Sequence, residues 1–188
     1  MDQTVLDKLN RCLLKGRPVL FTGAGFSRYG ENGQGKNIPT GAELKAKILT
    51  ELLGFEEDSD DYKDLIINTL ADIYGFAQEE KSELVVRDFV FSLFTDCTPK
   101  SFHSIIAQFN WKRVYTTNID DLYENAAKQD SLLVQNMSNR RESFGGKKIE
   151  YIKLHGCVRN PSGGIVFSRQ DYIDSMLKSQ DYRFNMFG

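Results

Sequence analysis

The sequence predicts an α/β fold in which a parallel sheet carries an inserted block of helices. Short apolar segments at residues 18–22, 112–117 and 149–154 are each followed directly by a glycine or a polar motif, as is typical of buried parallel strands. Helical patterns fill most of residues 55–110, between the first two segments. A further helical pattern follows the second segment, so strands and helices alternate along the chain.

The remaining elements follow from local signals. We expect an amphipathic helix at residues 4–15, a weaker strand at 132–135 and a short strand at 165–167. Capping-box patterns at residues 40–43 and 168–171 each predict the start of a helix. These elements suit one domain over residues 1–188. No clear closing strand precedes Gly188, so we expect an amino-terminal part of a longer protein, incomplete at its carboxyl-terminal end.

The charge balance excludes a general attraction to nucleic acid or to an anionic membrane. The formal net charge is −2 over 188 residues. The acidic stretch at residues 56–61 is interpreted as a solvated loop and helix start. Basic residues around residues 140–148 are interpreted as a surface loop.

Cysteine usage indicates a reducing, cytoplasmic compartment. Cys12, Cys97 and Cys157 are far apart and form no CxxC pair, so neither a disulfide framework nor a four-cysteine zinc site is expected. The first sixteen residues do not resemble a signal peptide. No apolar run approaches the roughly 20 residues that span a bilayer.

Three motifs follow predicted strands: Gly23-Ala-Gly-Phe-Ser27, Thr116-Thr-Asn-Ile-Asp120 and Lys153-Leu-His-Gly156. The carboxyl ends of strands line the ligand crevice of an open parallel sheet, so the three motifs can converge there. Glycines followed by the start of a helix can bind a phosphate group. The motif can also be an ordinary turn, because Arg28 stands where the dinucleotide-binding fingerprint has its third glycine.

Two residues in these motifs have both a structural and a chemical interpretation. Asn118 can cap the following helix, with Asp121 at its third position. His155 can be a structural histidine, but its place at a strand end suits acid–base work near neutral pH. His103, the second of two histidines, lies in a helical pattern beside apolar neighbours and is interpreted as structural.

As an ordered set, these motifs resemble the sirtuin family, specifically its branch of bacterial antiphage effectors. The resemblance extends over about residues 18–175 and is also carried by Ile38-Pro-Thr40 and Pro99 to His103. It implies a Rossmann-like sheet with a small inserted helical module, and NAD as the ligand and substrate.

The resemblance also implies residue roles. The glycine turn would hold the phosphates and the adjacent ribose through Gly23, Ala24, Gly25 and Ser27. Asn118 would orient the attacking water or hydroxyl beside the nicotinamide ribose, and Asp120 would lie near the nicotinamide carboxamide. His155 would act as a general base toward a ribose hydroxyl.

The sequence departs from deacetylating sirtuins in several places. Only Cys157 lies near the position of their zinc module, so we expect no zinc module and no bound metal. Pro39-Thr40 replaces the usual Pro-Asp, and the chain ends before the family's next glycine-containing strand.

The predicted activity is therefore that of an NAD glycohydrolase, releasing nicotinamide and ADP-ribose as a gated antiphage effector. The alternatives are a deacylase or ADP-ribosyltransferase, and a nucleotide-sensing module without turnover. Gating implies a homo-oligomer, a regulatory domain, a partner protein or a phage trigger. No membrane and no direct nucleic-acid binding are expected.

Overall fold

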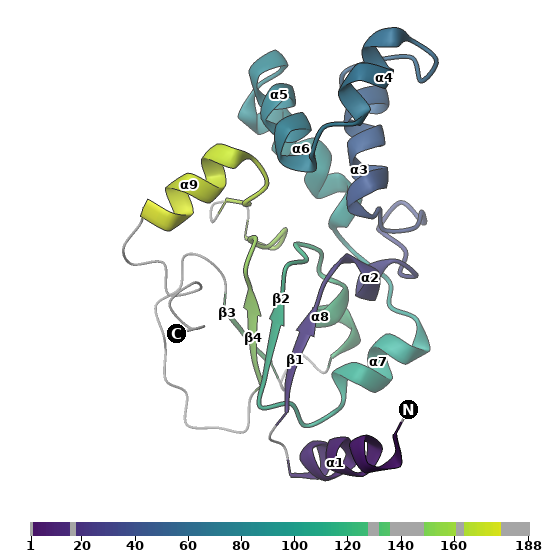
Figure 1. Ribbon diagram of the computed structural model, residues 1–188, viewed down its shortest axis with the longest axis vertical. Helices are drawn as coiled ribbons and strands as arrows, with labels where there is room; N and C mark the ends of the chain where they lie inside the picture. The colour runs from purple at the N-terminus through teal and green to yellow at the C-terminus, as the bar shows by residue number, and fades with distance from the viewer. Residues whose placement is uncertain (1, 16–17, 128–131, 136–148, 161–163, 178–188) are drawn as a thin grey trace.

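The computed structural model describes residues 2–15, 18–127, 132–135, 149–160 and 164–177 (Figure 1). Its sheet has four strands in the order β1-β2-β4-β3, and every neighbouring pair is parallel. The strands are β1 (Val19–Thr22), β2 (Arg113–Thr116), β3 (Leu132–Gln135) and β4 (Ile149–Lys153). The predicted α/β fold with a parallel sheet is confirmed.

The chain between β1 and β2 is mostly helical. After the short α2 (Ala24–Ser27) come α3 (Gly41–Lys47), continued by the π-helical turn η1 (Ile48–Leu52), then α4 (Asp60–Ile66), α5 (Leu70–Glu80) and α6 (Glu83–Phe94). We call residues 41–94 the helical module. The module projects beyond the carboxyl ends of the strands, and α7 (Ser101–Ala107) leads the chain back to β2 (Figure 1).

The other helices flank the sheet. The first helix, α1 (Gln3–Leu14), lies near the amino ends of the strands and buries none of its residues (Figure 1). The helix that follows β2 is α8 (Leu122–Ala126), and the last described helix is α9 (Arg169–Leu177), which lies near the helical module. In the described part of the chain, no helix is long and apolar enough to cross a membrane.

Helices α7 and α8 cover one face of the sheet. Side chains alternate between the two faces of a strand, so Val114 and Tyr151 point to this face. They pack there with Ala107, Tyr123 and Ala126. The Tyr123 and Tyr151 rings stack, with 4.6 Å between their centroids.

The helical module packs against the loops that follow the strands. Its buried residues form one cluster with Ile119 and Leu122 after β2, and with Val158 and Ile165 after β4. The module's own members of that cluster include Leu44, Ile48, Leu49, Ile73, Tyr74, Ala77, Val86, Val90 and Leu93. This shared core fixes the module relative to the strand ends.

Hydrogen bonds join the segment that enters the module to the segment that leaves it. Glu31 forms bridges with both Asn37 and Thr98. The Thr98 N–H donates to the Glu31 carbonyl at 2.6 Å, and the Gly33 N–H donates to the Thr95 carbonyl at 2.9 Å. We call this pairing of residues 31–37 with residues 95–98 the stem.

Local helix signals are confirmed where the capping box is present. At Thr40 the side chain accepts from the Glu43 N–H, and the Glu43 carboxylate accepts from the Thr40 N–H. Ser168 and Asp171 exchange the same pair of hydrogen bonds at the start of α9. Each pair satisfies two backbone donors that a helix start would leave unpaired.

Two local predictions were wrong. Residues 165–167 do not form a strand, because only an isolated bridge joins Ile165 to Gly156. Asn118 does not cap a helix, since α8 begins later and its N-cap residue is Asp121. The predicted basic loop, with Arg140, Arg141, Lys147 and Lys148, lies outside the described residues.

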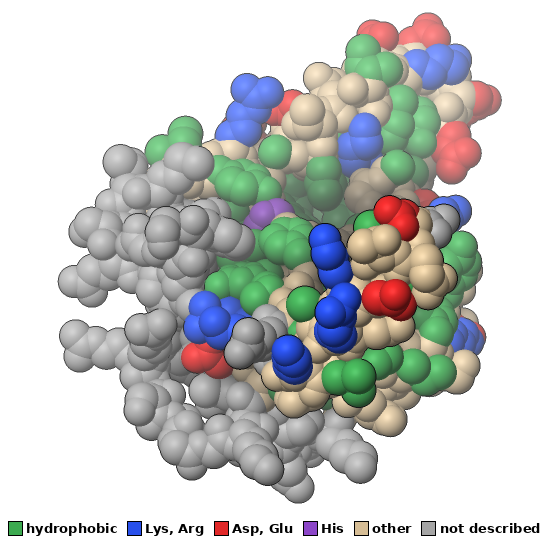
Figure 2. Space-filling model, turned by 60° about the horizontal axis from the view of Figure 1, so that its bottom comes forward, with side chains coloured by type: hydrophobic (Ala, Val, Ile, Leu, Met, Phe, Trp, Pro, Cys, Tyr) green, Lys and Arg blue, Asp and Glu red, His purple; other side chains and the backbone are tan. Residues whose placement is uncertain are grey.

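Charged side chains of both signs are spread over the molecule. In Figure 2 they lie singly or in small groups on the surface that grey atoms leave visible, with several acidic groups at the far end of the helical module. The acidic stretch at residues 56–61 belongs to this end, and the Asp60 side chain there is fully exposed.

Candidate active site

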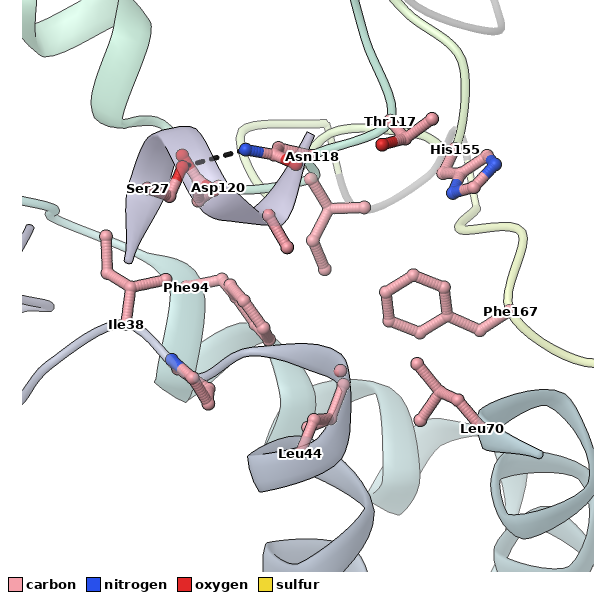
Figure 3. Close-up of a pocket in the computed structure, with 14 residues that line it drawn as sticks. Ser27, Ile38, Leu44, Leu70, Phe94, Thr117, Asn118, Asp120, His155 and Phe167 are labelled. Atoms are coloured by element: carbon pink, nitrogen blue, oxygen red, sulfur yellow. Dashed lines mark hydrogen bonds between the residues drawn. The ribbon is translucent and has the colours of Figure 1, made fainter. Parts of the chain in front are cut away.

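A cavity of about 150 Å³ lies between the carboxyl ends of the strands and the helical module. Its polar wall comes from the three predicted motifs, through Ser27, Asn118, Asp120 and His155. Its apolar wall includes Ile38, Leu44, Leu70, Phe94 and Phe167, opposite the polar residues in Figure 3. Segments separated by about 130 residues of sequence therefore share one site.

Asn118 is held by the glycine turn. Its side-chain nitrogen donates to the Gly23 carbonyl at 3.0 Å and to the Ser27 hydroxyl at 2.8 Å (Figure 3). Because a carbonyl oxygen can only accept, the amide nitrogen must lie on this side. Both amide hydrogens are thereby used, and Oδ1 is the atom that remains to accept a hydrogen bond from a ligand or water.

Ser27 connects Asn118 to Asp120. The Ser27 side chain is buried, its hydroxyl accepts from the Asn118 amide, and it lowers the pKa of the Asp120 carboxyl. Its hydroxyl is therefore engaged with protein groups, so this structure gives it a positioning role in addition to the predicted place in the phosphate and ribose site.

Asp120 is buried where β2 turns toward α8. Its carboxylate accepts from the Leu122 N–H at 3.0 Å. Burial raises the pKa of Asp120 to about 6, while the Lys153 ammonium and the Ser27 hydrogen bond act in the opposite direction. The carboxyl therefore changes charge close to the neutral range.

A buried ion pair lies behind this loop. Lys153 is the last residue of β4, and its Nζ donates to the Asp120 backbone carbonyl at 2.5 Å and to the Glu124 carboxylate at 2.8 Å. The Lys153 and Glu124 side chains are 0% and 3% exposed. Lys153 therefore fixes the backbone of Asp120 relative to β4 without lining the cavity.

The glycine turn reaches the cavity through α2. Ala24 lines the cavity, whereas Gly23 and Gly25 do not appear among its lining residues. A Cβ on Gly25 would meet nothing within 4 Å, so this side of the turn is open. The first N–H groups of a helix lack intrahelical acceptors, which makes the turn compatible with an anionic group.

Gly156 allows the chain to fold back beside His155. Its φ is +96°, and a Cβ there would lie 2.3 Å from the Gly164 carbonyl oxygen. The backbone of His155 accepts from the Val166 N–H at 3.0 Å. This close approach brings Phe167 and α9 against the imidazole.

His155 has two aromatic neighbours from the returning segment. The Phe167 ring centroid is 6.4 Å away and the Tyr172 centroid 5.6 Å away, both nearly perpendicular to the imidazole. The Tyr172 hydroxyl lies 3.2 Å from Nε2 of His155. Phe167 lines the cavity together with His155.

His103 is a structural residue that supports the glycine turn from behind. Its side chain is fully buried; Nδ1 accepts from the Lys100 N–H at 2.9 Å and Nε2 lies 2.7 Å from the Phe26 carbonyl. Only the neutral tautomer with hydrogen on Nε2 satisfies both contacts. Burial lowers the pKa of His103, which keeps the ring neutral.

Several residues of this site were not among the predictions. Lys153 was named only as the first residue of its motif, without a role, and Glu124 had no signal beyond a charged residue in a short helix. Phe167 and Tyr172 appeared as ordinary strand and helix residues, since only the fold-back at Gly156 brings them to His155. Among the described residues, no group of three or more histidine, cysteine, aspartate or glutamate side chains could hold a metal ion.

Comparison with known proteins identifies the second half of the chain. Residues 112–187 match the family model of the SIR2-like domain, a range that contains Asn118, Asp120, His155 and Tyr172 but not the glycine turn. A search of curated proteins finds no match. SIR2-like domains bind NAD, and the match indicates NAD-related chemistry. Residues 112–187 are therefore similar to a SIR2-like domain.

Proposed function

We propose that the protein is an NAD glycohydrolase, which cleaves the bond between nicotinamide and ribose to give nicotinamide and ADP-ribose. The observation that carries this proposal is that Asn118 and His155 line one cavity whose opposite wall is apolar. An apolar wall suits the flat nicotinamide ring, and the polar wall suits the ribose and its nucleophile.

The cavity volume of about 150 Å³ is below the roughly 300–1,000 Å³ of typical ligand pockets. It therefore suits one end of the dinucleotide, and we assign it to the nicotinamide and its ribose. The diphosphate would extend toward Ala24 and the open side of Gly25.

In the proposed reaction the bond between ribose C1′ and the nicotinamide nitrogen breaks, and its electron pair leaves with nicotinamide. Oδ1 of Asn118 accepts a hydrogen bond from the attacking water and holds it in position. The water oxygen bonds to C1′ and its proton passes to the solvent. His155 acts as a base toward a ribose hydroxyl, which stabilises the electron-poor ribosyl centre.

The first test is a time course of NAD turnover, with products resolved by chromatography, for wild type, His155→Ala and Asn118→Ala. In the presence of candidate triggers we expect nicotinamide and ADP-ribose from wild type, and a loss of at least about 100-fold in each variant, the usual scale for removing an acid–base group or misplacing a reactant. Asn10→Ala, on the exposed side of α1, is the matched control. Thermal melts establish that each variant is folded.

The other outcomes identify the alternatives. Equal NAD turnover by wild type and both variants would contradict the proposal. An acylated ADP-ribose formed only with an acyl-lysine peptide would identify a deacylase. Saturable NAD binding without nicotinamide release, also in the presence of candidate triggers, would identify a sensing module.

We also propose that activity is gated, because unchecked hydrolysis would consume the NAD of the host cell. Homo-oligomerisation, a regulatory domain, a partner or a phage trigger could supply the gate, and cytoplasmic antiphage defence is the setting that the sirtuin-like resemblance implies. Constant activity of the purified protein, without any added factor, would count against gating.

A further inference from the structure

His155 is contacted from outside the cavity by a residue of another element. The Tyr172 hydroxyl lies 3.2 Å from Nε2 of His155, and the two rings stand at 86° to each other. His155 lines the cavity, whereas Tyr172 is not among its lining residues. Tyr172 therefore contacts the imidazole without lining the ligand space.

Helix α9 carries Tyr172 and is fixed at its start. Ser168 and Asp171 form the capping box, and Asp171 also accepts from the Phe167 N–H at 3.1 Å. Arg169 forms an ion pair with Asp72 of α5, at 2.6 Å between Nε and Oδ1. A second contact of 3.2 Å joins Nη2 of Arg169 to Oδ2 of Asp72. The position of Tyr172 thus depends on the helical module.

The hydroxyl of Tyr172 can restrain either tautomer of His155. It donates to Nε2 when Nε2 lacks hydrogen, and it accepts when Nε2 carries hydrogen. Burial raises the pKa of Tyr172, so the hydroxyl keeps its hydrogen throughout the neutral range. An active-site base is commonly oriented by such a third group, which does not touch the substrate itself.

We propose that Tyr172 is the positioning residue of His155: its hydroxyl fixes the plane of the imidazole through Nε2, and α9 couples that restraint to the helical module. The part of this inference that concerns turnover rests on the proposed function. The contact between Tyr172 and His155 can be tested by spectroscopy, independently of the proposed function.

The test compares the two histidines of the chain, with His155 as the probe and His103 as the reference. In protein labelled with ¹⁵N-histidine, the ring nitrogen signals report the tautomer and the pKa of each imidazole. His103 serves as the internal reference, because Lys100 and Phe26 hold its tautomer. Spectra are recorded between pH 5 and pH 9 for wild type, Tyr172→Phe and Tyr62→Phe, the last removing a hydroxyl from α4 in the helical module.

In Tyr172→Phe we expect the Nε2 signal of His155 to shift, because Nε2 loses its contact with the Tyr172 hydroxyl, with His103 unaltered. Tyr62→Phe should leave both histidines as in wild type. His155 signals that are identical in wild type and Tyr172→Phe would overturn the proposal, whatever the turnover of either protein.

Turnover provides the second readout. Loss of one hydrogen bond, about 1 kcal/mol, corresponds to a decrease in kcat of about fivefold, with KM within about twofold of wild type. An increase in kcat would overturn the proposal, because it would identify Tyr172 as an obstruction. Absence of turnover in wild type, also in the presence of candidate triggers, would contradict the proposed function and leave the spectroscopic result to decide the role of Tyr172.

Discussion

At the residue scale, the hydrogen bonds of Asn118 to Gly23 and Ser27 determine which of its side-chain atoms faces a ligand. The buried Ser27 hydroxyl accepts from the Asn118 amide and also lowers the pKa of the Asp120 carboxyl. The consequence for Asn118 is a defined polarity, with an oxygen rather than a nitrogen left for the nucleophile.

The raised pKa of Asp120 predicts a pH dependence. If the Asp120 carboxylate accepts a hydrogen bond from the nicotinamide carboxamide, kcat/KM should fall as the pH drops below about 6, approaching tenfold per pH unit. A pH profile of NAD turnover measures this, with Asp120→Asn as the comparison. If kcat/KM of Asp120→Asn fell in the same way below about pH 6, the pH dependence would belong to another group.

The effect of Asp120 on stability has the opposite direction. Its pKa is higher in the folded protein than the unperturbed value of 3.8, so its contribution is fully present below pH 3.8 and is lost as the pH rises through about 6. Urea unfolding measures this effect: relative to Asp120→Asn, the free energy of unfolding of wild type should be higher at pH 4 than at pH 7.

The buried pair of Lys153 and Glu124 predicts a strong effect of removing one partner. Lys153→Met would leave the Glu124 carboxylate buried without its cation, which typically costs about 3–5 kcal/mol. Chemical denaturation measures the loss. Lys153→Met combined with Glu124→Leu should recover much of the stability, and a double variant as unstable as the single one would contradict this account.

At the element scale, the segment after β4 depends on a backbone position that favours glycine. Gly156→Ala should destabilise the protein by more than the roughly 1–3 kcal/mol of a positive φ, because the new Cβ would also collide with the Gly164 carbonyl. Gly35→Ala is the matched control, since Gly35 has a φ of +71° but nothing within 4 Å of an added Cβ. Equal losses in the two variants, measured by denaturation, would show that the collision has no cost.

Local signals in the sequence predicted elements better than they predicted contacts. The capping boxes at Thr40 and Ser168 are confirmed, because their partners lie three residues away and the pattern contains the whole interaction. The capping role of Asn118 was wrong, because the Gly23 carbonyl, 95 residues away, accepts from its amide instead. Residues 165–167 failed as a strand since the returning segment forms only an isolated bridge, between Ile165 and Gly156.

At the scale of the whole molecule, the sheet topology explains why the sequence could predict that the three strand-end motifs form one site. Parallel strands place their carboxyl ends together, so motifs that follow β1, β2 and β4 meet at one edge. The apolar wall was not foreseeable, because its residues belong to helices whose packing on the strand ends has no local signal. The contact between Tyr172 and His155 likewise depends on how α9 docks against α5.

The stem has a consequence for protein engineering. Because residues 31–37 are paired with residues 95–98, the chain enters and leaves the helical module at the stem. The segment between the two sides of the stem can therefore be exchanged as one unit, and Asn118 and His155 lie outside that segment. A library confined to residues 39–94 would vary the shape of the ligand space while the strand-end chemistry stays constant.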